Sequence, residues 1–269
     1  MPSMTTCSAS IEDVLDEVAE QLRRARRALF ITGAGISVDS GLPTYRGLGG
    51  LYDSDETEEG MRIEEALSGQ LFAVRPDITW KYLIQIEKTC RGAKPNDAHL
   101  AIARLEGCLE RVTVFTQNVD GLHGQAGSSE VIEIHGNLQE LACTACRHEE
   151  AAGTLGERAM PPRCPSCGAV LRPKVVLFGE ALPEKELERF IDAFQAGFDI
   201  VFTIGTSNVF PYITQPVVLA ACSGIPTVEI NPARTRLSDS VDYYLPLGAA
   251  DAMSKLLGRL GLPPAAGKA

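Results

Sequence analysis

The sequence has no apolar run of the roughly 20 residues that a membrane-spanning helix requires. Its first residues, MPSMTTCSASIEDV, lack the basic segment and the following apolar segment of a secretory signal. Of its 269 residues, 45% are hydrophobic and 22% are charged, which is typical of a globular protein with a sizeable core. We therefore expect a cytoplasmic protein with no membrane partner.

The sequence also has no excess of basic residues: 25 Lys and Arg stand against 35 Asp and Glu, for a net charge of −10. Non-specific nucleic-acid binding needs clustered Lys and Arg to contact phosphates, so we expect no nucleic-acid partner. A cationic partner, such as a lysine-containing peptide, suits this charge better. Part of the charge lies in the run DSDETEE at residues 53–59, which a solvated loop explains equally well.

Four of the eight cysteines form two CxxC pairs separated by 17 residues, Cys143 with Cys146 and Cys164 with Cys167. Two such pairs bind one Zn²⁺ tetrahedrally, at about 2.3 Å per Zn–S bond. Four thiolates leave no open coordination position, so we expect one structural zinc per chain. Redox activity of a CxxC pair is an alternative. A nucleic-acid-binding zinc ribbon is another, disfavoured because the segment has few Arg residues among its acids.

The other cysteines are scattered along the chain at Cys7, Cys90, Cys108 and Cys222. Cys108 and Cys222 lie among apolar residues, which predicts buried thiols. Reduced cytosolic thiols and one metal site explain the cysteine count most simply.

Short apolar runs alternate with helical patterns along most of the chain. A capped amphipathic helix is expected to begin after Ser10, whose partner is Asp13, and to run to about Arg27. Strand-like runs follow at residues 28–32, 111–118, 199–207 and 225–232, with helical patterns such as residues 98–109 and 183–194 between them. This alternation predicts an α/β protein with a Rossmann-like, doubly wound parallel sheet.

Two stretches interrupt the alternation and predict an inserted small domain. One is a helical module at residues 47–91, and the other is a zinc-binding module at residues 139–173. The discontinuous Rossmann-like domain then comprises residues 1–46, 92–138 and 174–262, and we expect a disordered tail at residues 263–269.

Several strand ends carry small or polar residues, and parallel sheets bind ligands at this edge. The turn GAGIS at residues 33–37 resembles the opening of a dinucleotide-binding turn, although Val38 breaks the full glycine pattern. Arg46 could grip a phosphate. Gln117, Asn118 and Asp120 follow the second strand, and two later strand ends carry Gly205, Thr206, Ser207 and Asn231. Each of these could instead be an ordinary turn.

Two histidines are candidates for a general base. His135 follows the strand-like EVIEI, and His123 lies in the polar loop after the second strand. An imidazole titrates near neutral pH and suits this role, but an isolated His is more often structural. The spacing does not separate the two candidates.

The combination of motifs resembles the sirtuins, NAD-dependent protein lysine deacylases, of the bacterial type. The resemblance covers residues 27–257 and lies in the order and spacing of GAGIS…SGLPTYRG, TQNVDGLH, EIHG, the two CxxC pairs, KVVLFGE, GTS and IN. It implies that NAD⁺ is the co-substrate and that the sheet domain binds it. The implied NAD site consists of Gly33, Ala34, Gly35, Tyr45, Arg46, Gln117, Asn118, Asp120, Gly205, Thr206, Ser207, Asn231 and Ala249.

The resemblance also implies roles in catalysis and substrate binding. Asp120 would hold the nicotinamide carboxamide, Asn118 and Gln117 would order the ribose and nearby water, and His135 would be the base. In the family mechanism, the acyl-lysine carbonyl oxygen attacks the ribose and expels nicotinamide, and the acyl group leaves on ADP-ribose. The substrate site would contain Val176, Phe178, Gly179 and Glu180, with the last three pairing with the peptide backbone as an added strand.

Three departures from the family pattern bear on specificity. Tyr45 stands where the family commonly has Phe beside the nicotinamide pocket. Leu83 and Ile86 stand where succinyl- and malonyl-specific sirtuins carry Tyr and Arg, which favours neutral or long apolar acyl groups. Pro211 comes one residue sooner than usual after GTS, at the second peptide-pairing strand. A mono-ADP-ribosyltransferase or NADase on the same fold, or a non-catalytic NAD-sensing zinc scaffold, remains an alternative.

Overall fold

The computed structural model describes residues 10–44, 57–153, 155 and 158–263. Tyr45, Arg46 and most of the expected tail at residues 263–269 lie outside these ranges. Within the described ranges, no helix is both long and apolar enough to span a membrane.

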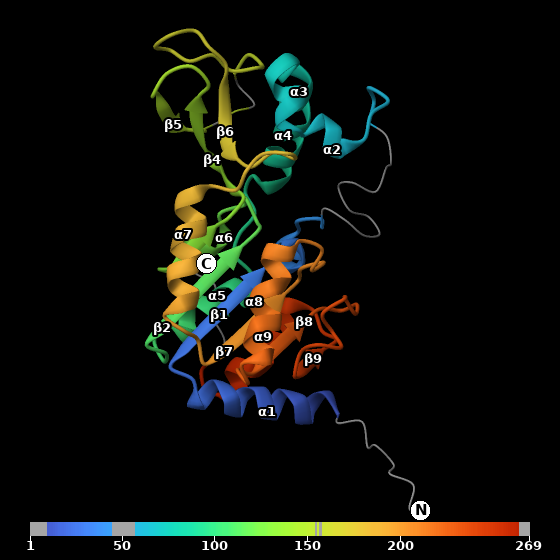
Figure 1. Cartoon of the computed structure of the whole chain (residues 1–269), viewed down its shortest axis with the longest axis vertical. Coiled ribbons are helices and arrows are strands. Elements are labelled where there is room, and N and C mark those ends of the chain that lie inside the picture. Colours follow the sequence, from blue (N-terminus) through green and yellow to red (C-terminus); the bar gives the residue numbers. More distant parts are fainter. Residues whose placement is uncertain (1–9, 45–56, 154, 156–157, 264–269) are drawn as a thin grey trace, which may run out of the picture.

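A six-stranded parallel sheet forms the centre of the larger part of the molecule (Figure 1). Its strands are β1 (Arg27–Thr32), β2 (Arg111–Thr116), β3 (Val131–Glu133), β7 (Ile200–Ile204), β8 (Thr227–Ile230) and β9 (Tyr243–Leu245). They lie in the order β3-β2-β1-β7-β8-β9, and every neighbouring pair is parallel. This is the Rossmann order, in which the chain reverses direction across the sheet between β1 and β7. Ligands of such sheets bind outside the strand ends at this switch point.

Helices cover both faces of the sheet, as expected for strands with almost no exposed side chain. One face packs against α1 (Ile11–Arg24), α5 (Asp97–Leu105) and α9 (Ala249–Arg259), and the other against α7 (Glu184–Gln195) and α8 (Pro211–Cys222). Alternate residues of β1 pack on opposite faces of the sheet. Phe30 packs in the core with α1, α5 and α9, and Leu29 and Ile31 pack in the core with α7 and α8. The doubly wound fold class is confirmed.

The first helix has the predicted cap but ends earlier than predicted. Ser10 Oγ accepts a hydrogen bond from the Asp13 N–H at 3.1 Å, and the Ser10 N–H donates to the Asp13 carboxylate at 3.0 Å. The expected end at about Arg27 is three residues too late, because α1 stops at Arg24. Arg27 is already the first residue of β1, and its N–H donates to the Asp199 carboxylate at 2.8 Å.

The two inserted stretches pack together as one small domain above the strand ends (Figure 1). Its helices are α2 (Ile63–Ala66), α3 (Gly69–Val74) and α4 (Pro76–Cys90), and its antiparallel strands are β4 (Gly136–Cys143), β5 (Glu149–Ala151) and β6 (Leu171–Val175). Trp80 of α4 is fully buried and donates its indole N–H to the Leu171 carbonyl at 2.9 Å. The residue limits given above for the two domains stay a prediction.

The burial predicted for two cysteines is wrong. Cys108 lies in the turn after α5, and Cys222 is the last residue of α8, and both are exposed. Their apolar sequence neighbours do not imply burial, because a surface helix buries only one face.

Candidate functional site

The switch point is built from three glycines in close contact. The Gly35 N–H donates to the Gly205 carbonyl at 2.8 Å, and the Gly33 N–H donates to the Ile204 carbonyl at 3.1 Å. A Cβ atom on Gly35 would lie 2.6 Å from the Gly205 Cα, which no side chain tolerates. Gly205 has φ +60°, in the left-handed region that favours glycine. The 3₁₀ segment η1 (Ala34–Ser40) can therefore lie directly against the loop after β7.

A cavity of about 770 Å³ lies beside these glycines, between the sheet edge and the small domain. This volume is within the range for binding a small molecule or cofactor. From the sheet edge, the sequence-predicted residues that line it are Gly33, Ala34, Gly35, Gln117, Asn118, His135, Gly205, Thr206, Ser207, Asn231 and Ala249. The small domain and the segment after it contribute further sequence-predicted residues to the lining, which are Leu83, Ile86, Val176, Phe178, Gly179 and Glu180.

Hydrogen bonds between strand ends hold the polar lining in place. Gln117 Nε2 donates to Thr206 Oγ1 at 3.0 Å, and Asn231 Nδ2 donates to the Thr206 carbonyl at 2.9 Å. These residues follow β2, β7 and β8, so Thr206 joins three strand ends. These hydrogen bonds fix the three strand ends relative to one another.

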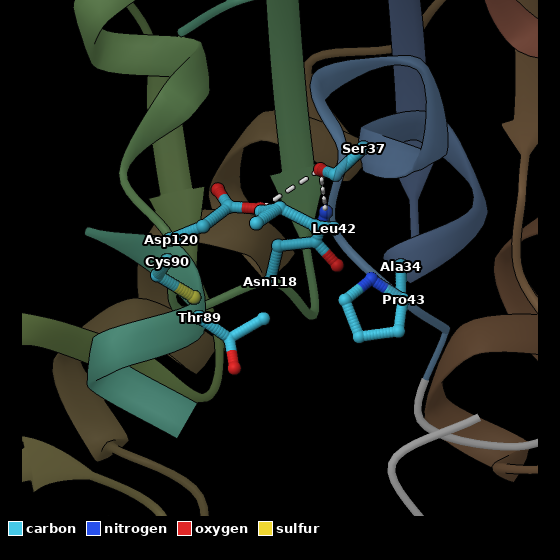
Figure 2. A pocket seen from close by; sticks show the side chains of 8 residues that line it. All are labelled: Ala34, Ser37, Leu42, Pro43, Thr89, Cys90, Asn118 and Asp120. Carbon is cyan, nitrogen blue, oxygen red and sulfur yellow. Dashed lines mark hydrogen bonds between the residues drawn. The ribbon is translucent and has the colours of Figure 1, made fainter. Parts of the chain in front are cut away.

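Asp120 lies in a smaller cavity adjoining the first, and Asn118 and Ala34 line both (Figure 2). The Ser37 hydroxyl donates to Asp120 Oδ2 at 2.8 Å, and the Leu122 N–H donates to Oδ1 at 3.0 Å. Burial raises the pKa of Asp120, and these two hydrogen bonds offset part of the rise. Thr89 and Cys90, at the end of α4, close the cavity on the small-domain side (Figure 2).

Asn118 leaves one buried acceptor without a partner among the described residues. Its side-chain nitrogen donates to the Gly33 carbonyl and to Ser37 Oγ, each at 3.2 Å, while Oδ1 is buried and unpaired. An unpaired buried polar group costs about 1–3 kcal/mol. A ligand that brings a donor to this oxygen would recover that free energy, so the site fits a hydroxyl or amide group.

His135 is the histidine that lines the larger cavity. Its Nδ1 lies 2.9 Å from the Gln117 carbonyl oxygen, and its Nε2 lies 2.7 Å from the Tyr212 hydroxyl. Burial lowers the pKa of His135, and the hydrogen bond to Gln117 opposes this effect. His123 lines neither of the two cavities; it is buried against Thr32 Oγ1 and the ring of His99. The structure thus separates two candidates that the spacing left equal.

The small-domain end of the larger cavity is apolar. Leu83 and Ile86 project from α4 with only 3% and 8% of their surface exposed. The other apolar residues of this end include Leu67, Val119, Leu138, Val175 and Leu177. An extended apolar group attached to a ligand could therefore bury itself here.

The segment that follows β6 is held on both sides. Arg172 contacts both carboxylate oxygens of Glu180, at 2.7 and 2.8 Å, and the Leu177 N–H donates to Glu180 at 2.9 Å. Phe178 donates its N–H to the Leu67 carbonyl at 3.0 Å and accepts from the Gly69 N–H at 3.1 Å. These backbone groups of Phe178 are already paired, so they are not available for the pairing with a peptide backbone expected above, and its side chain lines the cavity.

The four cysteines of the CxxC pairs form one cluster, with all sulfur atoms within 4.8 Å of one another. Three of the S···S distances are 3.5 Å (Cys143 to Cys167), 3.7 Å (Cys146 to Cys164) and 3.6 Å (Cys146 to Cys167). Zn–S bonds of about 2.3 Å in a tetrahedron place the sulfurs about 3.8 Å apart. The donor set therefore fits one Zn²⁺ with no open position.

Some site residues were not found from the sequence. Ser37 holds Asp120, and Tyr212 and Phe210 line the large cavity beside His135. The early Pro211 was the one signal near Tyr212, but it does not reveal a partner 77 positions away.

Comparison with known proteins finds one family. The model of the Sir2 family matches residues 33–211. The chain is 47% identical over 249 residues to NAD-dependent protein deacylase 2 of Pseudomonas syringae pv. tomato, which covers 91% of this chain and 99% of that protein.

Solved structures resemble more than nine tenths of the chain. A Sir2 homolog in complex with NAD has a TM-score of 0.81 and 34% identity, over 91% of this chain and 93% of that one. A Sir2 variant with a deacetylated p53 peptide and 3′-O-acetyl ADP-ribose has a TM-score of 0.83 and 27% identity, over 93% of this chain and 99% of that one.

Proposed function

The chain belongs to the Sir2 family of NAD-dependent protein deacylases. From this premise we propose a role for each site residue and the acyl groups that the enzyme accepts. The enzyme removes acyl groups from lysine side chains of proteins and uses NAD⁺ as co-substrate. The products are nicotinamide, O-acyl-ADP-ribose and free lysine. We also propose that it works in the cytoplasm, where thiols stay reduced, on protein substrates and not on nucleic acid or membranes.

We propose that the larger cavity holds the co-substrate against the sheet edge. Residues 33–35, Gly205, Ser207, Asn231 and Ala249 would line its adenosine and pyrophosphate part, with Tyr45 and Arg46 as further predicted contacts. NAD⁺ supplies a ribose carbon whose bond to nicotinamide can break. Two observations support the fit: the backbone contact of Gly35 with Gly205, and the unpaired Asn118 Oδ1.

Asp120 and Asn118 would act where the two cavities adjoin. The Asp120 carboxylate, fixed by Ser37, would accept hydrogen bonds from the nicotinamide carboxamide in the smaller cavity. Asn118 Oδ1 and Gln117 would order a ribose hydroxyl and a nearby water. Both cavities share Asn118, so a ligand that enters both passes this side chain.

His135 would be the general base. The Gln117 carbonyl can only accept, so Nδ1 carries the proton and the lone pair of Nε2 is the one available to a ribose hydroxyl. The lowered pKa keeps the ring neutral at physiological pH. The observation that carries this role is the place of the ring in the cavity that also contains the glycine turn and the apolar end.

The apolar end would accept neutral or long acyl chains. Leu83 and Ile86, which α4 contributes here, offer no hydrogen bond or charge to a succinyl or malonyl carboxylate. Burial of an unpaired carboxylate is unfavourable, whereas each buried CH₂ contributes about 0.8 kcal/mol. We expect turnover of acetyl- to myristoyl-lysine peptides and weak turnover of the succinyl and malonyl peptides. Equal kcat/KM for succinyl- and acetyl-lysine would contradict this preference.

The variant His135→Ala tests the catalytic assignment. We expect acyl-peptide turnover to fall by about 10²-fold or more, while NAD⁺ affinity measured by calorimetry stays close to wild type. Undiminished turnover would remove His135 as the base. Wild-type release of nicotinamide without deacylated peptide would instead favour the NADase or ADP-ribosyltransferase alternative.

A further inference from the structure

Tyr212 lies in the first turn of α8, lines the larger cavity and places its hydroxyl 2.7 Å from His135 Nε2. Phe210 stacks on the Tyr212 ring at a centroid distance of 5.4 Å and an interplanar angle of 17°. Both aromatic rings lie edge-on to the imidazole, at 6.3 and 6.1 Å between centroids. Phe210 and Tyr212 thus lie beside the His135 ring in the wall of the same cavity.

The hydrogen bond has only one direction when the ring is neutral. Nδ1 donates to the Gln117 carbonyl, which cannot donate, so Nε2 is the acceptor and the Tyr212 O–H is the donor. Burial raises the pKa of Tyr212 to about 12, so the phenol keeps its proton at neutral pH. The phenol thus occupies the lone pair that a general base needs.

The backbone that carries Tyr212 is fixed on its N-terminal side. Asn208 has φ +53°, and its fully buried side chain donates to Glu229 Oε1 at 3.0 Å and to Thr235 Oγ1 at 3.0 Å. Pro211 then occupies the first position of α8 and fixes φ there. The turn before α8 is thus fixed by buried contacts, whereas the Tyr212 side chain is only half-buried and faces the cavity.

Building on the role proposed above for His135, we propose that Tyr212 is a positioning residue. Its hydroxyl occupies Nε2 of this base until NAD⁺ binds. In the enzyme without NAD⁺, its hydroxyl donates to Nε2 and keeps the ring in the Nδ1–H tautomer, aimed into the cavity. A ribose hydroxyl of the co-substrate then replaces the phenol at Nε2. At Nε2, one hydroxyl donor, the phenol, is exchanged for another, the ribose hydroxyl. This exchange by itself transfers no proton.

This arrangement predicts an effect on the pKa of His135, because a hydrogen bond to the neutral form disfavours protonation. Two charged side chains that share the cavity with His135 have other partners: Asp39 accepts from the Ala250 N–H at 3.4 Å, and Arg234 pairs with Asp239. Glu133, before His135, accepts from Asn137 at 2.8 and 3.0 Å, and Glu180, on the segment after β6, pairs with Arg172. Gln117, at the end of β2, presents a neutral carbonyl. Among the described residues, Tyr212 is the ionisable side chain that forms a hydrogen bond with the His135 ring.

The test is the pH dependence of Tyr212→Phe, which removes the hydroxyl and keeps the ring. The acid limb of kcat/KM for NAD⁺ reports the free enzyme, and we expect it to move up by about 0.5 to 1 pH unit. The acid limb of kcat reports the substrate complex, in which the phenol has already left Nε2, and it should not move. The matched control is Tyr243→Phe, whose hydroxyl contacts Gln21. For Tyr243→Phe, the acid limbs of kcat/KM and of kcat should both superimpose on those of the wild type.

Superimposable kcat/KM profiles for Tyr212→Phe and wild type would overturn the inference, and so would an equal shift of both limbs. If Tyr212→Phe does not fold, the imidazole ¹⁵N shifts of His135 in the wild type decide. A protonated Nδ1 and a bare Nε2 support the inference, and a protonated Nε2 refutes it. Loss of turnover in His135→Ala with an unchanged Tyr212→Phe profile would refute this inference alone, whereas full turnover in His135→Ala would refute the proposed base.

Discussion

Gly35 and Gly205 stand in backbone contact across the switch point, with the Gly35 N–H 2.8 Å from the Gly205 carbonyl oxygen. The turn resembles the opening of a dinucleotide-binding turn, in which glycines let the backbone approach a pyrophosphate. The structure shows a second reason, because two chain segments from neighbouring strands meet where neither has room for a Cβ atom. The shape of the proposed co-substrate site therefore depends on both glycines together.

Gly35→Ala should damage the site and the fold together. The added methyl group would meet Gly205 backbone atoms at 2.6 and 2.7 Å, and overpacking of this kind typically destabilises by about 1–3 kcal/mol. We expect a lower free energy of unfolding in urea and a weaker affinity for NAD⁺ in calorimetry. Gly258→Ala in α9 is the control, since its Cβ meets nothing within 4 Å and should leave NAD⁺ affinity unchanged. Wild-type NAD⁺ affinity in Gly35→Ala would contradict the proposed cradle.

Asp120→Asn should lose activity yet gain stability at neutral pH. Burial raises the pKa of Asp120 above its usual 3.8, so the folded protein holds this proton more tightly than the unfolded chain does. The free energy of unfolding therefore falls as pH rises from the unfolded pKa through the folded one. Removal of the charge should raise stability at neutral pH, with no such gain below both pKa values. Urea unfolding at neutral and acid pH measures this difference, and a gain of the same size at both would exclude it.

Removal of the metal should affect the small domain first. Cys164 is 3% exposed and packs in the small-domain core, so loss of a zinc ligand there should loosen the cavity wall that α4 also forms. We expect about one zinc per chain by emission spectroscopy, and loss of both zinc and peptide turnover in Cys164→Ser. The exposed Cys222→Ser is the matched control and should keep both. A Cys164→Ser protein with full zinc content would disprove this site.

Glu180→Gln should weaken peptide binding more than NAD⁺ binding. Burial acts to raise the pKa of Glu180, but the Arg172 pair and the Leu177 N–H outweigh it and hold the pKa low. The carboxylate thus fixes the segment proposed to contact the peptide. We expect the peptide KM to rise about 3- to 10-fold in steady-state assays, with NAD⁺ affinity unchanged. Glu186→Gln, which breaks a surface pair with Arg189, should behave as wild type. The prediction fails if both variants give the same peptide KM.

Much of the fold follows from local sequence, because short apolar runs and capped helices report burial on one or two faces. The Ser10 cap and five of the six parallel strands, β1, β2, β3, β7 and β8, are examples, whereas the short edge strand β9 was not predicted. Two errors had different causes. Arg27 belongs to β1 because it pairs with Arg111, which is distant in the sequence, and Cys222 is exposed because a surface helix buries only one face. The site shows the same limit. Sequence motifs identified Asn118 and His135. The contact of Tyr212 with His135 joins residues 77 positions apart and becomes visible only in the folded structure.

The most direct test of the central claim is a product balance on the wild-type enzyme, with NAD⁺ and an acetyl-lysine peptide followed together by mass spectrometry. We predict that nicotinamide, O-acetyl-ADP-ribose and free-lysine peptide form in equal amounts and that none forms when NAD⁺ is omitted. Peptide deacetylation without NAD⁺ consumption, or nicotinamide release with the peptide left acetylated, would contradict the account.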